Sequence, residues 1–527
     1  MEDELYKKAL FDKAIALHQE GKLDEADDIY KSVLRNDDTN FAANYLHGCI
    51  LSDKLMFNDA IKYFNRSLKS NPDSFEVNNN LGIVYKELGD TKNAEKYFLK
   101  AISIDKDNFQ AYFNCANLYA DIRNYDAAIE YLEKTVKLND SFPEAYQRLG
   151  EMHQEKYKID RNKEYLHKSI ELFNNAITAK ELYTLPEFKL SSALISLGLS
   201  NLWLGNSTEA IKCFNKIQTM DTTNQEVLAD YIEKHLYNKK SISTLVTHEY
   251  EQLTFIDNDV DGIRNTKFTN EYYQELKRLY LKIKNNSFDL NDLSSTMRLN
   301  IAKILYNKPP NISSQNFINE DNDIKKLESE YLDSKPEVLI VDNLLTPDAL
   351  KKLQIFCRTA NIFKYTHNGG YVGAYLSRGL ANEFMLKLSE DLKSTFKNIF
   401  NNLKLTQAWI YKYESTKEGV NIHADPAVVN VNFWITPDEA NLDKKSGGLK
   451  IWNAIPPEDW AFEDYNAGVS VPKMKKFLSD NKSSEQIVPY KTNRAVIFNS
   501  KLFHTTDTFN FNDRYEDRRV NVTLLYD

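Results

Sequence analysis

One tripeptide places an imidazole and a carboxylate where both can reach the same ion. His423 and Asp425 lie two residues apart in the stretch GVNIHADPAVVNVNFWI. Because alternate residues of a β-strand point to the same side, the two side chains can converge on one cation. His504 follows another β-rich stretch about 80 residues later. Two imidazoles and one carboxylate bind a divalent transition metal and leave coordination positions open for other ligands.

The tripeptide alone carries little weight, because His-x-Asp is expected by chance roughly once in a chain of this composition. Each residue also has a structural explanation. His423 can hydrogen-bond within a loop, Asp425 before Pro426 can begin a turn, and His504 can be satisfied by its polar neighbours. The order of the surrounding elements is more informative. Strands are predicted at VLIVDN, QAWIYKY, VNVNFWI, GLKIW, RAVIFN and RVNVTLLY, and a helix at TPDALKKLQIFCRTA.

These elements follow a recognisable order. The motif stands at a strand start, Gly447 and Gly448 precede a later strand, a strand-borne histidine follows, and an arginine opens the final strand. This order resembles the Fe(II)- and 2-oxoglutarate-dependent oxygenases of prolyl hydroxylase-like layout. The resemblance implies a double-stranded β-helix, or jelly roll, with His423, Asp425 and His504 as iron ligands. It also implies 2-oxoglutarate as cosubstrate, dioxygen as oxidant and hydroxylation as the reaction.

That superfamily anchors the distal carboxylate of 2-oxoglutarate with a basic residue after the last histidine. A planar guanidinium suits such a contact, and Arg514, Arg518 and Arg519 are all available. On RVNVTLLY, Arg519, Asn521 and Thr523 share one face of the strand. The Arg-x-Asn pair resembles an element found on this strand in several branches. We therefore assign Arg519 and Asn521 to the cosubstrate, with Arg514 and Arg518 as alternatives.

Three further polar residues are candidates for the same pocket. Tyr413, ten residues before the first metal-binding histidine, is expected to place its phenol at the same carboxylate. Asn430 and Asn432 alternate with apolar residues, so one of them is expected to line the pocket. The other histidines, His367 among them, lie outside the pattern and are assigned no role.

The N-terminal part of the chain repeats itself every 34 residues. Two series of small residues recur with this period: Ala26, Ala60, Ala94 and Ala128, and then Gly48, Gly82, Ala116 and Gly150. A large residue stands four positions after each member of the first series: Tyr30, Phe64, Phe98 and Leu132. A helix–turn–helix unit of this length resembles the tetratricopeptide repeat. The segment NNLGIVYKELGDTKNAEKYFLKAISIDKD carries the likeness most closely. A fifth repeat is expected to contain an insertion near residues 157–165.

The predicted architecture is therefore multidomain. Residues 1–224 form an all-α tetratricopeptide solenoid, whose stacked repeats create a groove that binds peptides or proteins. Residues 225–305 are expected to be a helical cap or connector, and residues 306–335, which contain Pro309 and Pro310, a linker. Residues 336–527 form the jelly-roll oxygenase domain.

Composition limits the environment and the partners. The 527 residues carry a formal net charge of -9, which disfavours binding to nucleic acid. Four cysteines without a CxxC pair fit a reducing compartment. No secretion signal and no apolar run of the roughly 18 residues that a membrane span needs is visible, so we expect a cytoplasmic protein without membrane attachment.

The leading functional hypothesis is a dioxygenase that hydroxylates a protein or peptide recruited by the repeats. A repeat segment joined to this oxygenase type resembles the layout of collagen prolyl hydroxylases. Two alternatives stay open: a small-molecule or glycan oxygenase whose repeats serve for docking, and a non-catalytic tetratricopeptide scaffold. The sequence leaves the hydroxylated residue and the oligomeric state undetermined.

Overall fold

The computed structural model describes residues 2–183, 189–223, 238–259, 270–312, 315–367, 369–414 and 419–527. Contacts between residues divide the chain into two units, Met1–Ser196 and Leu197–Asp527. The division falls inside helix α11 (Leu190–Leu204), ahead of the boundaries expected at residues 224, 305 and 335. Those finer boundaries stay a prediction.

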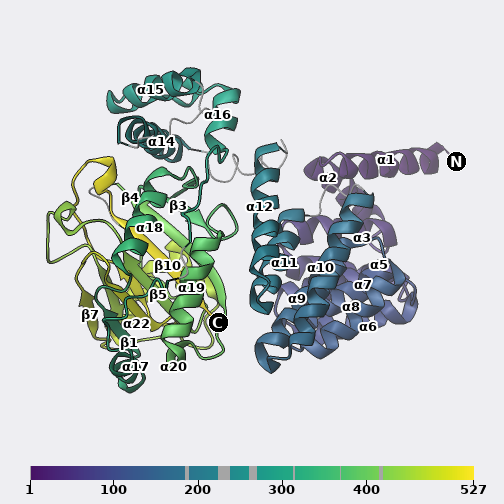
Figure 1. The fold of residues 1–527 in the computed structure, drawn as a ribbon. Helices are drawn as coiled ribbons and strands as arrows, with labels where there is room; N and C mark the ends of the chain where they lie inside the picture. The colour runs from purple at the N-terminus through teal and green to yellow at the C-terminus, as the bar shows by residue number, and fades with distance from the viewer. Residues whose placement is uncertain are drawn as a thin grey trace. The chain divides into compact units, whose positions relative to one another are not determined.

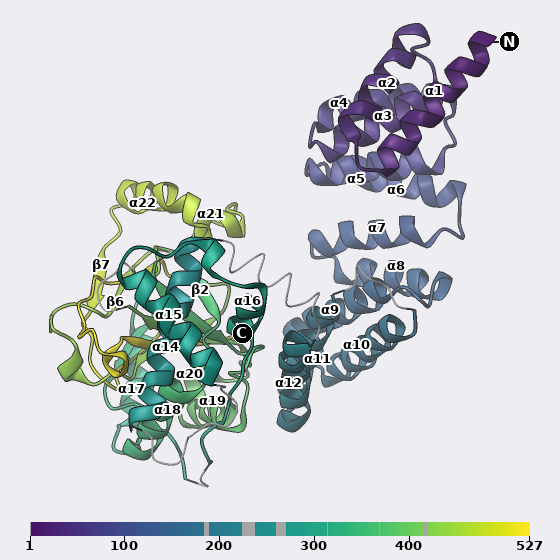
Figure 2. The ribbon, with the colours of Figure 1, turned by 90° about the horizontal axis from the view of Figure 1, so that it is seen from above.

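The first unit is a stack of paired α-helices, as the 34-residue period predicts (Figure 2). Its helices before α11 are α1 (Glu2–Gln19), α2 (Leu23–Asn36), α3 (Phe41–Asp53), α4 (Phe57–Ser70), α5 (Phe75–Glu87), α6 (Thr91–Ile104), α7 (Phe109–Asp121), α8 (Tyr125–Leu138), α9 (Pro143–Asp160) and α10 (Lys163–Tyr183). Polar caps fix where α3, α5 and α7 begin. Asn40, Ser74 and Asn108 each accept a hydrogen bond from a backbone N–H in the first turn that follows.

The small and large residues of the repeat meet across each helix pair. A Cβ atom on Gly82 would lie 2.4 Å from Cδ1 of Phe98, and one on Gly48 would lie 2.7 Å from Cε1 of Phe64. The absence of a side chain therefore lets an aromatic ring pack directly on the neighbouring helix backbone. The expected insertion in the fifth repeat takes the form of a longer helix: α9 has 18 residues, whereas α5 and α7 have 13.

The second unit combines helices with two β-sheets. Its helices are α12 (Ser207–Thr223), α14 (Lys239–Asp259), α15 (Asn270–Lys284), α16 (Ser295–Ala302), α17 (Ile324–Asp333), α18 (Pro347–Thr359), α19 (Glu383–Thr395), α20 (Lys397–Phe400), α21 (Phe462–Asn466) and α22 (Val471–Asp480). Its strands are β1 (Val338–Val341), β2 (Tyr365–His367), β3 (Tyr371–Tyr375), β4 (Leu405–Tyr413), β5 (Val429–Trp434), β6 (Leu449–Trp452), β7 (Glu485–Val488), β8 (Ala495–Asn499), β9 (His504–Thr506) and β10 (Val520–Tyr526).

All the strand pairs described are antiparallel, and they form a seven-stranded and a three-stranded sheet. The larger sheet has the order β1-β8-β5-β10-β4-β3-β2, and the smaller has the order β7-β6-β9. A buried cluster joins the inner faces of the two sheets; it includes Tyr413 and Trp434 from the larger sheet and Leu449 and Ile451 from the smaller. Helices α18 and α19 lie over the larger sheet (Figure 1).

The six strands predicted from the sequence are all present, and so is the predicted helix, α18. Thr346 caps α18 by accepting a hydrogen bond from the backbone N–H of Ala349, and Pro347 occupies its first position. The structure thus shows a helical-repeat region followed by a strand-rich region with antiparallel sheets. The more specific jelly-roll fold stays a prediction.

The helices between the repeats and the sheets pack onto the sheet unit. Gln252 on α14 donates hydrogen bonds to the carbonyl oxygens of Arg358 and Ala360, at the end of α18. The expected linker 306–335 also contains packed structure, because it holds α17 and the buried side chains of Phe317 and Ile318. The sequence pattern did not predict these contacts. None of the helices in the described ranges has the length and apolar character needed to cross a membrane.

The contact between Gly82 and Phe98 gives a direct test of the repeat packing. Alanine normally stabilises an exposed helix relative to glycine by up to about 1 kcal/mol. At position 82 we expect the opposite sign, with Gly82→Ala destabilising the protein by about 1–3 kcal/mol, because the new methyl group overlaps a buried ring. Chemical unfolding followed by the helical circular dichroism signal measures the change.

The matched control is the double variant Gly82→Ala/Phe98→Leu. Because the smaller leucine relieves the overlap, the two substitutions should be less damaging together than the sum of their separate effects. Additive effects would contradict the packing described.

Candidate metal centre

The two histidines of the predicted triad are backbone partners. The N–H of His423 donates to the carbonyl oxygen of His504 at 3.0 Å, and the N–H of His504 donates to that of His423 at 2.8 Å. This antiparallel bridge continues the smaller sheet beyond β9. Residues that exchange both hydrogen bonds project their side chains to the same side. The two imidazole rings are accordingly 4.2 Å apart between centroids.

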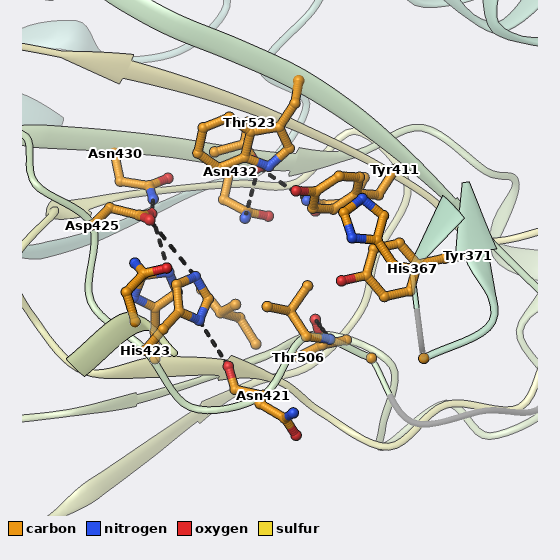
Figure 3. A pocket seen from close by; sticks show the side chains of 18 of the residues that line it. His367, Tyr371, Tyr411, Asn421, His423, Asp425, Asn430, Asn432, Thr506 and Thr523 are labelled. Carbon is orange, nitrogen blue, oxygen red and sulfur yellow. Dashed lines mark hydrogen bonds and ion pairs between the residues drawn. The ribbon is translucent and has the colours of Figure 1, made fainter. Parts of the chain in front are cut away.

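Asp425 completes the group from the other side. Its backbone N–H donates to the carbonyl oxygen of Ser500 at 3.0 Å. Its Oδ1 lies 3.7 Å from Nε2 of His423, and its Oδ2 lies 3.4 Å from Nε2 of His504. One ligand atom from each of the three residues lies within 4.8 Å of the others. The convergence predicted from the sequence is therefore found, and Figure 3 shows His423 beside Asp425 at one side of the pocket.

Hydrogen bonds set the tautomers of both imidazoles. Nδ1 of His423 lies 2.7 Å from the carbonyl oxygen of Asn421, and Nδ1 of His504 lies 2.9 Å from that of Leu502. A carbonyl oxygen can only accept, so each Nδ1 carries the proton. The lone pair of each Nε2 is then free to bind a metal. In both cases the acceptor is two residues earlier in the chain, so the same local geometry orients both rings.

The electrostatic environment keeps the group ready for a cation. Burial, together with the neighbouring His504, lowers the pKa of His423 to about 4, so this imidazole is neutral at physiological pH. Burial alone would raise the pKa of Asp425, yet the adjacent imidazoles and the amide of Asn430 hold it below its ordinary value. Nδ2 of Asn430 donates to Oδ2 of Asp425 at 2.9 Å. The donor set is thus two imidazole nitrogens and an ionised carboxylate.

A cavity of about 650 Å³ opens beside the triad, within the range of roughly 300–1,000 Å³ that is usual for ligand sites. Side chains of β3, β4, β5, β9 and β10 line it, together with both histidines and Asp425. Of the residues predicted for the pocket, Tyr413, Asn430, Asn432 and Asn521 all lie on its wall. Both asparagines of β5 line the cavity, whereas only one of them was predicted to do so.

Arg519 lies immediately behind this wall and does not itself line the cavity. Its Cζ atom is 4.8 Å from the ring centroid of Tyr413, which does line it. Two carbonyl oxygens hold the guanidinium: Nε donates to Gly447 at 2.7 Å and Nη2 to Gly448 at 3.2 Å. A Cβ atom at Gly448 would lie 1.8 Å from the carbonyl oxygen of Val488, so only glycine fits in this strand contact.

Two buried donors at this end of the cavity are unsatisfied. Within the described parts of the chain, neither Nη1 of Arg519 nor the hydroxyl of Tyr413 has a hydrogen-bond partner of normal geometry. Burial raises the pKa of Tyr413 despite the adjacent charge of Arg519, so its hydroxyl keeps the proton. A carboxylate accepts only, and would satisfy both donors. The residues present therefore fit an anionic ligand that reaches from the metal towards Arg519.

The two alternative arginines are engaged elsewhere. Arg518 forms an ion pair with Glu251 on α14. Nη2 of Arg514 lies 2.6 Å from Oδ2 of Asp517, and the side chain is 68% exposed. Of the three candidates, Arg519 alone stacks on a residue of the cavity wall.

Aromatic residues opposite the triad went unnoticed in the sequence. His367, Tyr371, Tyr375, Trp409 and Tyr411 all line the cavity. Figure 3 shows Tyr371, His367 and Tyr411 grouped across the pocket from His423. Alternation along QAWIYKY could have indicated the two on β4, because they share a face with Tyr413. The others come from the short strands β2 and β3, which lack a comparable pattern.

Comparison with known proteins supports the repeats. Residues 73–141, which comprise α5 to α8, match the tetratricopeptide repeat family. The match covers less than half of the chain, so it identifies the repeats and not the chain as a whole. A comparison with curated protein sequences found no match.

Several solved structures are similar to part of the chain. MamA is 24% identical, with 35% of this chain and 97% of that chain covered and a TM-score of 0.30. PilF of Pseudomonas aeruginosa is 14% identical, with coverages of 44% and 100% and a TM-score of 0.34. YrrB, described as a TPR protein with an unusual peptide-binding site, is 16% identical, with coverages of 39% and 97% and a TM-score of 0.29. Likenesses this distant carry no argument about function.

We predict that the triad binds one divalent cation, and that Asp425→Ala or His423→Ala abolishes this binding. Either substitution leaves only two protein ligands, which are too few to hold the ion. Electron paramagnetic resonance of Mn(II) titrated into the full-length protein reports free and bound ion directly. His167→Ala, which changes an exposed histidine on α10, is the control and should bind normally. Unchanged Mn(II) binding by the Asp425→Ala protein would rule out this site.

Asn430 is predicted to tune that affinity without contacting the ion. Asn430→Leu removes the hydrogen bond that orients the Asp425 carboxylate. Loss of such an orienting partner typically weakens metal binding by about 10- to 100-fold. The same titration measures the change, and an unaltered affinity would show that the carboxylate is positioned by other contacts.

Proposed function

We propose that the second unit is an Fe(II)- and 2-oxoglutarate-dependent dioxygenase with a double-stranded β-helix fold, which hydroxylates a protein or peptide recruited by the repeats. The observation that carries the proposal is the convergence of two imidazole nitrogens and one carboxylate at the end of a cavity. Two histidines and one carboxylate, with the remaining positions open, are the ligand set of non-haem Fe(II) oxygenases.

The fold supports this assignment. The metal-ligand residues lie where the two antiparallel sheets meet: His504 begins β9 of the smaller sheet, and Asp425 leads into β5 of the larger. The apolar cluster between the sheets closes one end of the cavity, since Tyr413 and Leu449 belong to both. Two facing antiparallel sheets with a site between them are the arrangement that a jelly roll provides.

The end of the cavity nearest Arg519 is the part that fits 2-oxoglutarate. His423, Asp425 and His504 would hold Fe(II), and Arg519 with Tyr413 would bind the distal carboxylate of the cosubstrate. When bound, the metal and 2-oxoglutarate supply the oxidising chemistry: dioxygen inserts one oxygen atom into the substrate and the other into succinate, with release of CO2.

The protein's own residues bind and orient. Gly447 and Gly448 fix the guanidinium of Arg519 in its plane through their carbonyl oxygens. Tyr413, whose raised pKa keeps its hydroxyl protonated, would donate to the same carboxylate. Asn521, two residues after Arg519, lines the same cavity.

The repeats supply the recruitment step. Tetratricopeptide stacks commonly bind peptides and partner proteins along their surfaces. The family match at residues 73–141 supports such a role in this chain. In this proposal the first unit selects the substrate protein, and the second modifies it.

A non-catalytic scaffold is the second candidate function. The family match at residues 73–141 supports protein binding, which such a scaffold would perform without catalysis. The two candidate functions differ in whether the protein converts 2-oxoglutarate to succinate. If the protein is a dioxygenase, the purified full-length protein supplied with Fe(II) and 2-oxoglutarate should form succinate, and the His423→Ala protein should not. A wild-type protein that binds Fe(II) and 2-oxoglutarate yet forms no succinate, even with a captured partner, would favour the scaffold.

We predict that Arg519→Ala spares metal binding and weakens 2-oxoglutarate binding. The loss should be about 10- to 100-fold, because a charge-assisted hydrogen-bond pair of about 1.5–3 kcal/mol disappears. Anaerobic calorimetry with Mn(II) present separates the two affinities.

Arg514→Ala is the matched control, since it removes a guanidinium that is exposed and paired with Asp517. It should bind 2-oxoglutarate as the wild type does. Normal binding by Arg519→Ala with loss in an Arg518 variant would move the anchor to Arg518.

A further inference from the structure

The proposed function leaves one side of the cavity unassigned. Along β4, Gln407, Trp409, Tyr411 and Tyr413 point to the cavity in alternation. Tyr413 lies at the Arg519 end, whereas Gln407 at the other end is exposed and the two residues between them are half-buried. The strand therefore runs from the cosubstrate end to the mouth. A substrate entering beside the cosubstrate must pass over this strip.

Charge excludes several kinds of substrate. Among the described residues on the wall there is no lysine, arginine or glutamate, and the carboxylate of Asp425 accepts from Asn430 and faces the proposed metal. A charged side chain that rests on this part of the wall would lose its water and meet no opposite charge among the described side chains, which is unfavourable. The group that enters should be uncharged.

Hydrogen bonding narrows the choice further. Nδ2 of Asn430 donates to the carboxylate of Asp425, which fixes the amide so that Oδ1 is its free acceptor. That Oδ1 is buried and has no partner in the parts of the chain that are described. Ionised 2-oxoglutarate carries only acceptors, so it cannot supply the missing hydrogen. An N–H group of the substrate can supply it.

The aromatic strip suits a flat, polar group. The hydroxyl of Tyr375 lies 3.0 Å from Nε2 of His367 and 3.1 Å from the hydroxyl of Tyr411. This chain of groups can both donate and accept. Figure 3 shows His367 and Tyr411 facing the triad across the pocket.

We propose that the substrate group is a side-chain carboxamide, an asparagine or glutamine of the recruited protein. Its plane stacks on the Trp409–Tyr411 strip, and its NH2 donates to Oδ1 of Asn430 beside the metal. This inference rests on the proposed function, since it places the carboxamide next to the cation and the cosubstrate.

Small probes of matched shape test this without knowledge of the partner protein. Full-length protein with Mn(II) and saturating 2-oxoglutarate is mixed with propanamide, butanone, propanoate or propylammonium. Bound Mn(II) broadens the proton resonances of any probe that lies close to it, so the broadening reports occupancy of this cavity. Butanone replaces the NH2 of propanamide with a methyl group, and therefore isolates the donor.

We expect propanamide to be broadened, butanone to bind about fivefold more weakly for want of one hydrogen bond, and the two ions to be broadened least. Trp409→Leu should reduce the broadening by propanamide. Trp460→Leu, which removes a tryptophan that does not line the cavity, should leave it unchanged. These results would support the carboxamide site.

Contrary results separate the two proposals. If Mn(II) and 2-oxoglutarate bind in the same samples while butanone or either ion matches propanamide, the carboxamide inference fails alone; equal binding of butanone and propanamide would mean that water satisfies Asn430. Absence of broadening by propanamide has the same consequence. If Mn(II) or 2-oxoglutarate does not bind, the proposed function fails and this inference fails with it.

Discussion

The candidate site depends on two backbone hydrogen bonds between His423 and His504. They join the segment ahead of β5 to β9 of the smaller sheet, and so connect the two sheets at the point where the donor atoms meet. Two imidazoles this close would repel each other if both were protonated, and burial of His423 keeps at least that ring neutral. The carboxylate of Asp425 then faces two nitrogen lone pairs, an arrangement that a divalent cation satisfies.

Because side chains alternate along each strand, one face of the larger sheet lines the cavity and the other packs against helices. On β4, Tyr411 and Tyr413 face the cavity, whereas Lys412 between them is buried on the opposite face. Nζ of Lys412 donates to the carbonyl oxygen of Cys357 on α18 and to the hydroxyl of Tyr515, both at 2.7 Å. The helices thus fix the strand from behind, which holds the side chains of the cavity wall in position.

Much of this could be predicted from the sequence, because it depends on local pattern. The 34-residue period predicted the paired helices in which Gly82 and Phe98 meet, and strand alternation predicted that His423 and Asp425 would share a side. Other features depend on contacts between distant segments. Nothing local links the glycines at 447 and 448 to the guanidinium of Arg519, or the helix α14 to the end of α18. His367 was overlooked because β2 has only three residues, too few for a readable alternation.

The most direct test of the account is a crystal structure of the protein grown anaerobically with Fe(II) and 2-oxoglutarate. We expect a single anomalous iron peak within bonding distance of Nε2 of His423, Nε2 of His504 and a carboxylate oxygen of Asp425, with the cosubstrate reaching from the iron towards Arg519. Iron bound elsewhere, or a triad whose atoms coordinate no ion at saturating Fe(II), would contradict it.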